Sequence, residues 1–414
     1  MRKLLLLLSV LWGCLSCANS KNLVVEVKNT LDFDRKNEIV ELPMDEVAKR
    51  LKLPNTAQLV VTNENGEEVA YQITSDNLLI FLADVKAASK AKYSIEIGKP
   101  KNIPTSTTGR RYPNRLDDMA WENDLVGFRA YGPAMQANGE RGFGYDLWLK
   151  RGTYEPVLES FYEKALDPLT AQRIKELRKT DPKAAGELRR SISYHLDHGY
   201  GMDCYAVGPT LGAGTTALVD NGDIVYPWCY KEEKILDNGP LRFSVKLTYN
   251  PLTVGKDTNV VETRIITLDK GQHMNRTEVR YEGLSQATTL VAGMGIHEPD
   301  SIATYTADKD NGFVSYIDPT QGPDNGKVFV GIAMPNDMKD AKAVYFSPEE
   351  KAKRNKTDGQ LLAYTTYVPG TTVTYYWGFA WNRGLYDIKS FDAWNAYLTQ
   401  RVKMLRTPLV VKIK

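Results

Sequence analysis

The stretch RFSVKLTY at residues 242–249, followed by VVETRIITLD at 260–269, RTEVRYEG at 276–283 and TLVAGMGIH at 289–297, decides the fold class of this chain. Apolar and polar residues alternate within these runs, and glycine-containing turns separate them, which is typical of antiparallel β-strands. Further runs of this kind continue as far as Trp381. An open sheet of so many strands would curl, so we predict a mainly β protein with a large antiparallel super-sandwich.

The N-terminal part of the chain shows shorter runs of the same pattern. Residues 22–100 contain NLVVEV, LLIFLADV and AKYSIEIG, separated by Asn/Gly turns, with the helix-forming MDEVAKRL among them. This pattern predicts a small immunoglobulin-like β-sandwich. Residues 101–120 are rich in Pro, Thr and basic side chains and are predicted to be a linker.

The large domain is predicted to span residues 121–414, with a helical insertion at about 155–192. Within the insertion, helix formers and charge pairs four residues apart surround a break at Pro182, which indicates two short helices. A helix at 391–404 and a final strand, PLVVKIK, complete this domain.

The first 21 residues read as a secretory signal: a charged start, the apolar run LLLLLSVLWG and a small-residue exit. Cys14 and Cys17 both lie where a lipoprotein cysteine would, and Cys17 is our choice for the acceptor because Ser16 precedes it and a polar tail follows. No later run is long and apolar enough to span a bilayer. We expect a periplasmic protein or a lipoprotein tethered to the outer membrane, which meets the membrane only through its lipid.

The net charge and the number of cysteines limit which partners and covalent cross-links the chain can have. The chain has 53 Lys and Arg against 51 Asp and Glu, and the leader contains Arg2 and Lys3, so the mature chain is formally neutral. Neutrality argues against a nucleic-acid partner. Only Cys204 and Cys229 remain after the leader, and two cysteines are compatible with one disulfide or with two buried thiols.

The segment YHLDHGYGMDCYAVGPTLGAGTTAL, residues 194–218, holds two of the four histidines and fits neither a helix nor a strand in its first half. Its polar side chains would be costly in a core, so we interpret it as a rigid loop over a binding surface. The alternative is a surface loop of Asx and Gly turns. The candidate site residues of this loop are His195, His198, Tyr200, Asp203 and Tyr205.

A metal site in this loop has weaker support. The His195–His198 spacing matches no strong zinc pattern, and calcium would need more carboxylates. No cofactor is predicted, and the sequence leaves a divalent metal open.

Strand alternation in WENDLVGFRAYGP places Gly127, Arg129 and Tyr131 on one face. This face offers a guanidinium and a phenol, and Arg129 is suited to holding a carboxylate. The alternative for Arg129 is a salt bridge to Asp124 or Glu122.

The same alternation in TLVAGMGIHE places Gly293, Gly295 and His297 together. Glycines beside a histidine would leave open space over the sheet, as a ligand cleft requires. The alternative is a structural histidine.

An aromatic strip lies on YYWGFAWNRG, residues 375–384, where every second residue is aromatic. Such a strip can stack on sugar rings, but we favour an aromatic core between two sheets. On the other face of the strand, Tyr376 and Asn382 are then the better cleft candidates.

Several motifs together resemble a known family: WENDLVGFRAYGPA, the 194–218 loop, VYPWCY, LDNGPLRFSVKL, VVETRIITLD and GMGIHE. They are similar to those of a secreted bacterial family labelled a domain of unknown function, and they cover roughly residues 110–400. The resemblance implies a component of polysaccharide-utilisation gene clusters that acts in the breakdown of complex, uronate-containing glycans. The strand-rich C-terminal half also resembles the galactose-mutarotase type of super-sandwich, a likeness of fold alone.

These observations lead to one main hypothesis: an exported carbohydrate-active enzyme, a lyase or glycoside hydrolase, whose partner is a uronate-bearing oligosaccharide or polysaccharide. In a β-elimination, His297 or His198 would be the base, and Tyr200 or Tyr131 the acid. Residues assigned to substrate binding are Arg129 as carboxylate clamp, His195, Asp203, Tyr205, Tyr376 and Asn382. Hydrolysis would instead need a carboxylate pair such as Glu122 or Asp124 with Asp203. The alternatives are a non-catalytic glycan-binding protein and a mutarotase-like or epimerase-like enzyme.

Overall fold

The structure is a computed structural model that describes residues 22–54, 56–297, 305–355 and 357–414. The predicted signal peptide and its lipid-acceptor Cys17 lie outside the described residues. The chain is mainly β, with antiparallel sheets packed as sandwiches, which confirms the predicted fold class. None of the described helices is both long enough and apolar enough to cross a bilayer.

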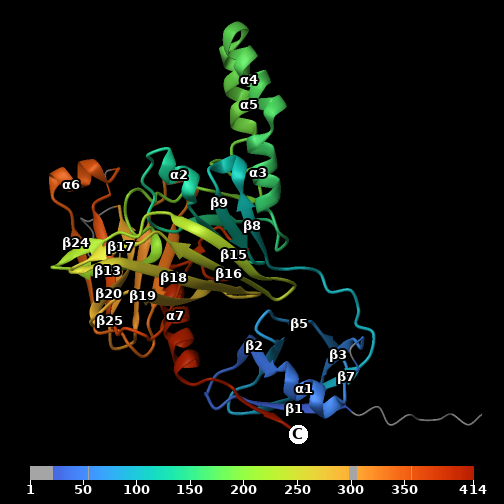
Figure 1. The fold of residues 1–414 in the computed structure, drawn as a ribbon. Helices are drawn as coiled ribbons and strands as arrows, with labels where there is room; N and C mark the ends of the chain where they lie inside the picture. Colours follow the sequence, from blue (N-terminus) through green and yellow to red (C-terminus); the bar gives the residue numbers. More distant parts are fainter. Residues whose placement is uncertain (1–21, 55, 298–304, 356) are drawn as a thin grey trace, which may run out of the picture.

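Two sheets form a small sandwich at the lower end of the molecule in Figure 1. Their inner faces bury side chains such as Val25, Phe81 and Ile95 completely, because alternate residues of each strand face the opposite sheet. Helix α1 (Met44–Leu51) adds Val47 to this core. In spatial order the strands are β27 (Val410–Ile413), β1 (Leu23–Lys28), β7 (Lys90–Ile97), β3 (Leu59–Asn63) and β4 (Glu68–Val69), facing β2 (Arg35–Pro43), β6 (Leu78–Val85) and β5 (Tyr71–Ile73).

The last strand of the chain belongs to this small sandwich and not to the large domain, to which we had assigned residues 121–414. Strand β27 pairs antiparallel with β1, so that Ile413 lies opposite Val25. Helix α7 (Phe391–Arg406) packs on the large domain through Trp394 and leads the chain to β27. The alternating VVKI sequence predicts a strand that can pair with a free sheet edge. It does not indicate which of the two domains provides that edge.

The large domain is a super-sandwich of a nine-stranded and a five-stranded sheet. The aromatic strip on β26 is fully buried between them, with Trp377 stacked on Tyr145 at 4.1 Å between ring centroids. The larger sheet contains β15 (Tyr230–Asn238), β16 (Arg242–Tyr249), β17 (Leu252–Val254), β18 (Asp257–Asp269), β19 (Met274–Glu282), β26 (Val373–Trp381), β23 (Val328–Ala333), β22 (Phe313–Asp318) and β21 (Tyr305–Asp308). The smaller sheet contains β14 (Asp223–Val225), β13 (Ala213–Asp220), β20 (Thr288–Ile296), β25 (Gly359–Tyr367) and β24 (Asp340–Tyr345).

A further five-stranded sheet carries most of the candidate site. Its order is β12 (Gly201–Met202), β11 (Asp146–Lys150), β10 (Gly127–Ala130), β9 (Asp118–Glu122) and β8 (Thr108–Tyr112). Strand β8 and the short 3-10 turn η1 (Pro113–Arg115) lie inside the predicted linker, so only the first part of residues 101–120 is irregular.

The helical insertion follows β11 and comprises α3 (Leu158–Leu166), α4 (Pro168–Thr180) and α5 (Pro182–Ser191). Pro182 is the first residue of α5, as the predicted break requires, and the side chain of Asp181 caps that helix. In Figure 1 the α4–α5 hairpin projects away from the sheets, on the side opposite the small sandwich.

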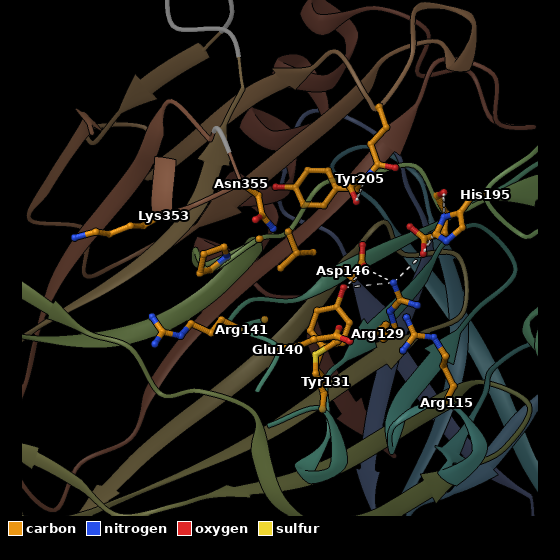
Figure 2. A pocket seen from close by; sticks show the side chains of 17 residues that line it. Arg115, Arg129, Tyr131, Glu140, Arg141, Asp146, His195, Tyr205, Lys353 and Asn355 are labelled. Carbon is orange, nitrogen blue, oxygen red and sulfur yellow. Dashed lines mark hydrogen bonds and ion pairs between the residues drawn. The ribbon is translucent and has the colours of Figure 1, made fainter. Parts of the chain in front are cut away.

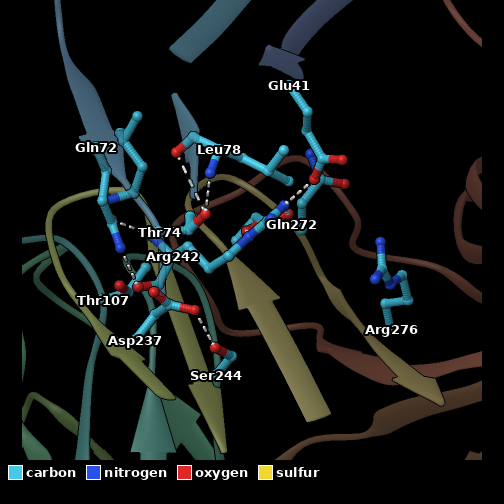
Figure 3. A network of polar contacts seen from close by, with 12 residues as sticks. Glu41, Gln72, Thr74, Leu78, Thr107, Asp237, Arg242, Ser244, Gln272 and Arg276 are labelled. Carbon is cyan, nitrogen blue, oxygen red and sulfur yellow. Dashed lines mark hydrogen bonds and ion pairs between the residues drawn. The ribbon is translucent and has the colours of Figure 1, made fainter. Parts of the chain in front are cut away.

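The two domains are joined by a network of polar contacts (Figure 3). The Gln72 amide oxygen accepts hydrogen bonds from the backbone N–H groups of Arg242, at 2.9 Å, and of the residue before it, and the Gln72 amide nitrogen donates to the Arg242 carbonyl. The Arg242 guanidinium lies 2.8 Å from Glu41, and Asp237 accepts from the Ser75 N–H at 2.7 Å. These contacts fix the small sandwich against β15 and β16.

Candidate functional site

A cleft of about 490 Å³ opens at one end of the sheet that contains β9, β10 and β11 (Figure 2). Pockets that hold small ligands have volumes from a few hundred to about 1,000 Å³, so this cleft is of the size of a small-ligand site. Its walls come from the end of β10, from α2 (Pro133–Ala137) and the turn after it, from the start of β11, from residues 195–209, and from the end of α6 (Pro348–Lys353).

Arg129 lies at the floor of the cleft and binds three carboxylates. Its Nη2 contacts Asp146 and lies 2.8 Å from Asp203, while Nη1 lies 3.4 Å from Asp118. Strand register explains the meeting: Arg129 faces Asp146 across the β10–β11 pair, and Asp118 lies on the same face of β9, diagonally opposite. All four side chains are almost completely buried.

Three buried carboxylates around one guanidinium leave a surplus of negative charge. Burial, assisted by the Asp146 carboxylate, raises the pKa of Asp203 from 3.8 to about 6, although Arg129 and His195 act against this rise. Burial also raises the pKa of Asp118. The cluster therefore retains a proton at a pH where exposed carboxyl groups have lost theirs.

Tyr131 connects this cluster to the open cleft. Its hydroxyl donates to Asp146 at 2.5 Å and lies 3.4 Å from the Nη2 of Arg129. Burial, followed by the charges of Asp146 and Asp203, raises the pKa of Tyr131 well above 10, although Arg129 acts in the opposite direction. Tyr131 is therefore a protonated phenol at neutral pH and can act as an acid.

His195 lies at the same cleft and presents one ring nitrogen as a base. Its Nδ1 lies 3.0 Å from the carbonyl oxygen of Asp203, and the side chain is 54% exposed. Because a carbonyl can only accept a hydrogen bond, Nδ1 carries the hydrogen, and Nε2 of the neutral ring carries the lone pair.

The mouth of the cleft has more cationic than anionic side chains, because Arg115, Arg141 and Lys353 line it with one carboxylate, Glu140. Figure 2 shows Arg115 and His195 on one side of Tyr131, with Arg141 and Lys353 on the other. The Nε of Arg115 donates to the Tyr194 hydroxyl at 3.1 Å, and its two terminal nitrogens have no hydrogen-bond partner among the described residues. These cations suit an acidic ligand.

Two glycines allow the 194–218 segment to reach the cleft. Gly201 has φ +121°, and a Cβ there would lie 1.8 Å from the Leu149 carbonyl oxygen, where β12 pairs with β11. Gly212 has φ +57°, and a Cβ there would lie 2.4 Å from the Tyr145 carbonyl oxygen. Only glycine permits both approaches. They place Asp203 and Tyr205 at the cleft, where the Tyr205 hydroxyl donates to the Gly212 carbonyl at 2.9 Å.

The structure brings five of the predicted site residues to one cleft: Arg129, Tyr131, His195, Asp203 and Tyr205. Arg129 was expected to hold a substrate carboxylate; in the structure its guanidinium contacts three carboxylates of the protein. Its partners are also not Asp124 or Glu122, the salt-bridge partners considered from sequence. Arg129 instead holds the carboxylate cluster together.

His198 and Tyr200, both expected to be catalytic, do not line the cleft, so the structure does not bring them together with Tyr131 and Arg129. Asp197 accepts hydrogen bonds from the N–H groups of Gly199 and Gly201, an Asx turn that directs the intervening residues outward. His198 is exposed, with Nε2 3.1 Å from the Ser193 carbonyl oxygen, and Tyr200 is 51% exposed.

His297 is also absent from the lining of the cleft, so it does not share a cleft with His198. Its Nδ1 lies 2.7 Å from Asp318, and its ring meets the ring of Tyr205 edge-on at 6.1 Å. The expected open space over the neighbouring glycines is filled at Gly293, where a Cβ would lie 2.6 Å from Leu362. His297 therefore supports the Tyr205 wall.

Tyr376 and Asn382 lie elsewhere. Tyr376 lines a separate cavity at the domain junction, together with Arg401. The Asn382 side chain accepts a hydrogen bond from the Lys327 N–H at 3.0 Å and shapes a turn. Neither residue contributes to the cleft.

Several cleft residues had no counterpart in the sequence prediction. Asp146 alternates with Trp148 on β11, but only strand pairing shows that it faces Arg129. Arg115 lay in the predicted linker, Arg141 lies in the irregular segment after α2, and Lys353 is the last residue of the short helix α6.

Candidate metal-binding clusters and disulfides are both absent from the part of the chain that the structure describes. It contains no group of three or more His, Cys, Asp or Glu side chains arranged to hold a metal ion. Cys204 and Cys229 are buried free thiols, so the disulfide considered from sequence is not formed. Burial raises the pKa of Cys229 to about 12, which makes it unreactive.

Comparisons with known proteins define the family. The sequence profile of a family described as "Domain of unknown function (DUF4861)" matches residues 27–411. "Uncharacterized protein P7" of Formosa agariphila is 25% identical to this chain and aligns with 96% of each sequence.

Two solved structures from Enterococcus faecalis are similar at greater distance. A protein in the glycosyl hydrolase family 38 has a TM-score of 0.48 at 11% identity, and an alpha-mannosidase has a TM-score of 0.44 at 10% identity. Each match covers 95% of this chain, which spans slightly less than half of either protein.

Proposed function

This chain belongs to the DUF4861 family, and we propose that it is a carbohydrate-active enzyme that cleaves uronate-bearing oligosaccharides by β-elimination. One observation carries the proposal. The same cleft is lined by a protonated phenol (Tyr131), an imidazole with an available nitrogen (His195) and a guanidinium (Arg115) whose two terminal nitrogens have no partner among the described residues. These are the three groups that the reaction requires.

Each group has one role in the reaction. Arg115 binds the uronate carboxylate, which acidifies the adjacent C5–H. Nε2 of His195 takes that proton, the C4–C5 double bond forms, and the C4–O bond breaks with its electron pair on the leaving oxygen. Tyr131 donates its proton to that oxygen, so charge and atoms balance without a co-reactant.

The buried carboxylate cluster holds Tyr131 in place and keeps its phenol protonated until the leaving oxygen takes the proton. Asp146 accepts the phenol hydrogen bond, and Arg129 lies close enough to stabilise the phenolate formed after proton transfer. The proton retained by the cluster can return to Tyr131 through Asp146. Arg129 and Asp203 are positioning residues in this scheme.

Glycoside hydrolysis is the second candidate, and the raised pKa of Asp203 beside Asp146 favours it. Both carboxylates contact the same nitrogen of Arg129, a short separation that is compatible with a retaining mechanism and too small for an inverting one. Their almost complete burial and their ion pairs with Arg129 speak against direct contact with substrate.

The cellular setting is a further part of the proposal. The leader and Cys17 support export to the periplasm or lipid tethering at the outer membrane, within a polysaccharide-utilisation system. An exported location would give the cleft access to oligosaccharides outside the cytoplasm.

The test is a screen of galacturonate, glucuronate, mannuronate and guluronate oligomers and of mixed uronate glycans. An increase in ultraviolet absorbance from the unsaturated product, lost in Tyr131→Phe, supports elimination. Reducing ends released without that absorbance would assign hydrolysis. Binding without any product would overturn the enzyme proposal in favour of a glycan-binding protein.

A further inference from the structure

We propose that a smaller cavity beside the cleft binds the sugar residue next to the one that reacts. This cavity has a volume of about 230 Å³ and lies between the helical insertion and residues 192–195. Arg115 and His195 line both cavities and form their common boundary. A ligand in one cavity is therefore within one glycosidic linkage of the other.

The lining of this side cavity fits one face of a sugar ring. Leu166 at the end of α3 and Ile192 after α5 are half-buried and provide an apolar surface for the C–H face of a ring. Ser193 and Tyr194, whose hydroxyl accepts a hydrogen bond from Arg115, also line this cavity and are its polar members besides the two arginines and His195. Apolar surface combined with a few polar groups is the usual composition of a small-ligand site.

The charge of the cavity identifies the ligand class. Arg115 and Arg189 line it, with no aspartate or glutamate among the residues of its walls. Arg189 is exposed and has no hydrogen-bond or ion-pair partner in the described part of the chain. The terminal nitrogens of Arg115 and the guanidinium of Arg189, in the same lining as an apolar surface, suit an acidic sugar, so the occupant is a second uronate of the same oligosaccharide.

The helical insertion then gains a defined task. Ala165 and Leu166 from α3 and Arg189 from α5 form the outer wall, so the insertion makes the site selective for oligosaccharides over monosaccharides. The inference rests on the proposed function only in its choice of an acidic oligosaccharide as ligand.

The experiment compares dissociation constants for galacturonate, glucuronate, mannuronate and guluronate, each as oligomers of increasing length from the monomer. Wild-type protein is expected to bind the dimer more tightly than the monomer in at least one series. Arg189→Glu should weaken dimer binding by about fivefold or more, and Ile192→Trp should remove the gain by filling the cavity. Neither should alter monomer binding.

Arg190→Glu is the matched control, because Arg190 carries the same charge change on the same helix but does not line the cavity. If the affinity for the dimer exceeded that for the monomer by the same factor in wild type, Arg189→Glu and Ile192→Trp, the side-cavity assignment would be overturned. The proposed function would be unaffected by that result. Absence of binding in all four series would overturn both.

Discussion

The hydroxyl of Tyr131 donates a 2.5 Å hydrogen bond to Asp146, the same carboxylate that contacts Arg129 on the neighbouring strand. A phenol at the cleft surface is thereby connected to a buried group of charges whose proton content it can exchange.

Replacing Tyr131 by Phe removes the proposed acid while keeping the ring. We expect kcat to fall by about 100- to 10,000-fold, the usual contribution of a positioned acid or base, with little change in substrate binding. Steady-state kinetics with calorimetric binding would measure both. Tyr200→Phe is the control, since that exposed phenol lies outside the cleft; equal losses in the two variants would refute the assignment.

The two histidines of the 194–198 segment provide a matched pair. His195→Ala should lose activity by about 100-fold or more because the proposed base is removed, whereas His198→Ala should remain close to wild type. Added imidazole should partly restore His195→Ala. Full activity of His195→Ala would show that another group takes the proton.

Arg115→Ala removes the guanidinium whose terminal nitrogens are the proposed carboxylate donors at the mouth. We expect kcat/KM to fall by about 100-fold on a uronate substrate, because the carboxylate loses its charge partner as negative charge develops. With a carboxyl-reduced, neutral analogue of the same glycan, wild type and Arg115→Ala should bind equally. A similar loss of affinity for the neutral analogue would point to a packing role instead.

The raised pKa of Asp203 predicts how stability changes with pH. Between 3.8 and about 6, the folded protein holds a proton on Asp203 that the unfolded chain has already released. The free energy of unfolding therefore decreases as pH rises through this window. Asp203→Asn lacks this titration, so urea unfolding at several pH values should give a flatter curve. Parallel curves for the two proteins would contradict the raised pKa.

Gln72 makes three hydrogen bonds across the domain junction, two of them to backbone N–H groups. Gln72→Leu leaves buried groups without partners, and we expect a loss of about 1–3 kcal/mol in unfolding free energy. Denaturant unfolding measures the effect, with exposed Gln286→Leu as the neutral control. No loss relative to that control would mean that water replaces the amide.

The sequence supports the fold better than the site, for physical reasons. Alternation and turns indicate strands directly, so both sandwiches and the insertion were predictable. Pairing between strands is a property of the folded chain, so the partnership of Arg129 with Asp146 and the place of β27 were not. Gly201 and Gly212 indicated a conformationally constrained loop from sequence alone. The Asx turn at Asp197 could not be predicted, so the sequence did not show that His195 lines the cleft and His198 does not.

The pairing of β27 with β1 also has a consequence for how the chain is made. The small sandwich is the first domain to be synthesised, yet one edge of its larger sheet is filled only when the last strand arrives. Until then β1 presents an unpaired edge, while the large sandwich can already assemble from local hairpins. The small sandwich is therefore completed after the strands of the large sandwich are available, and until β27 pairs, the edge of β1 is the part of this domain most open to unwanted strand pairing.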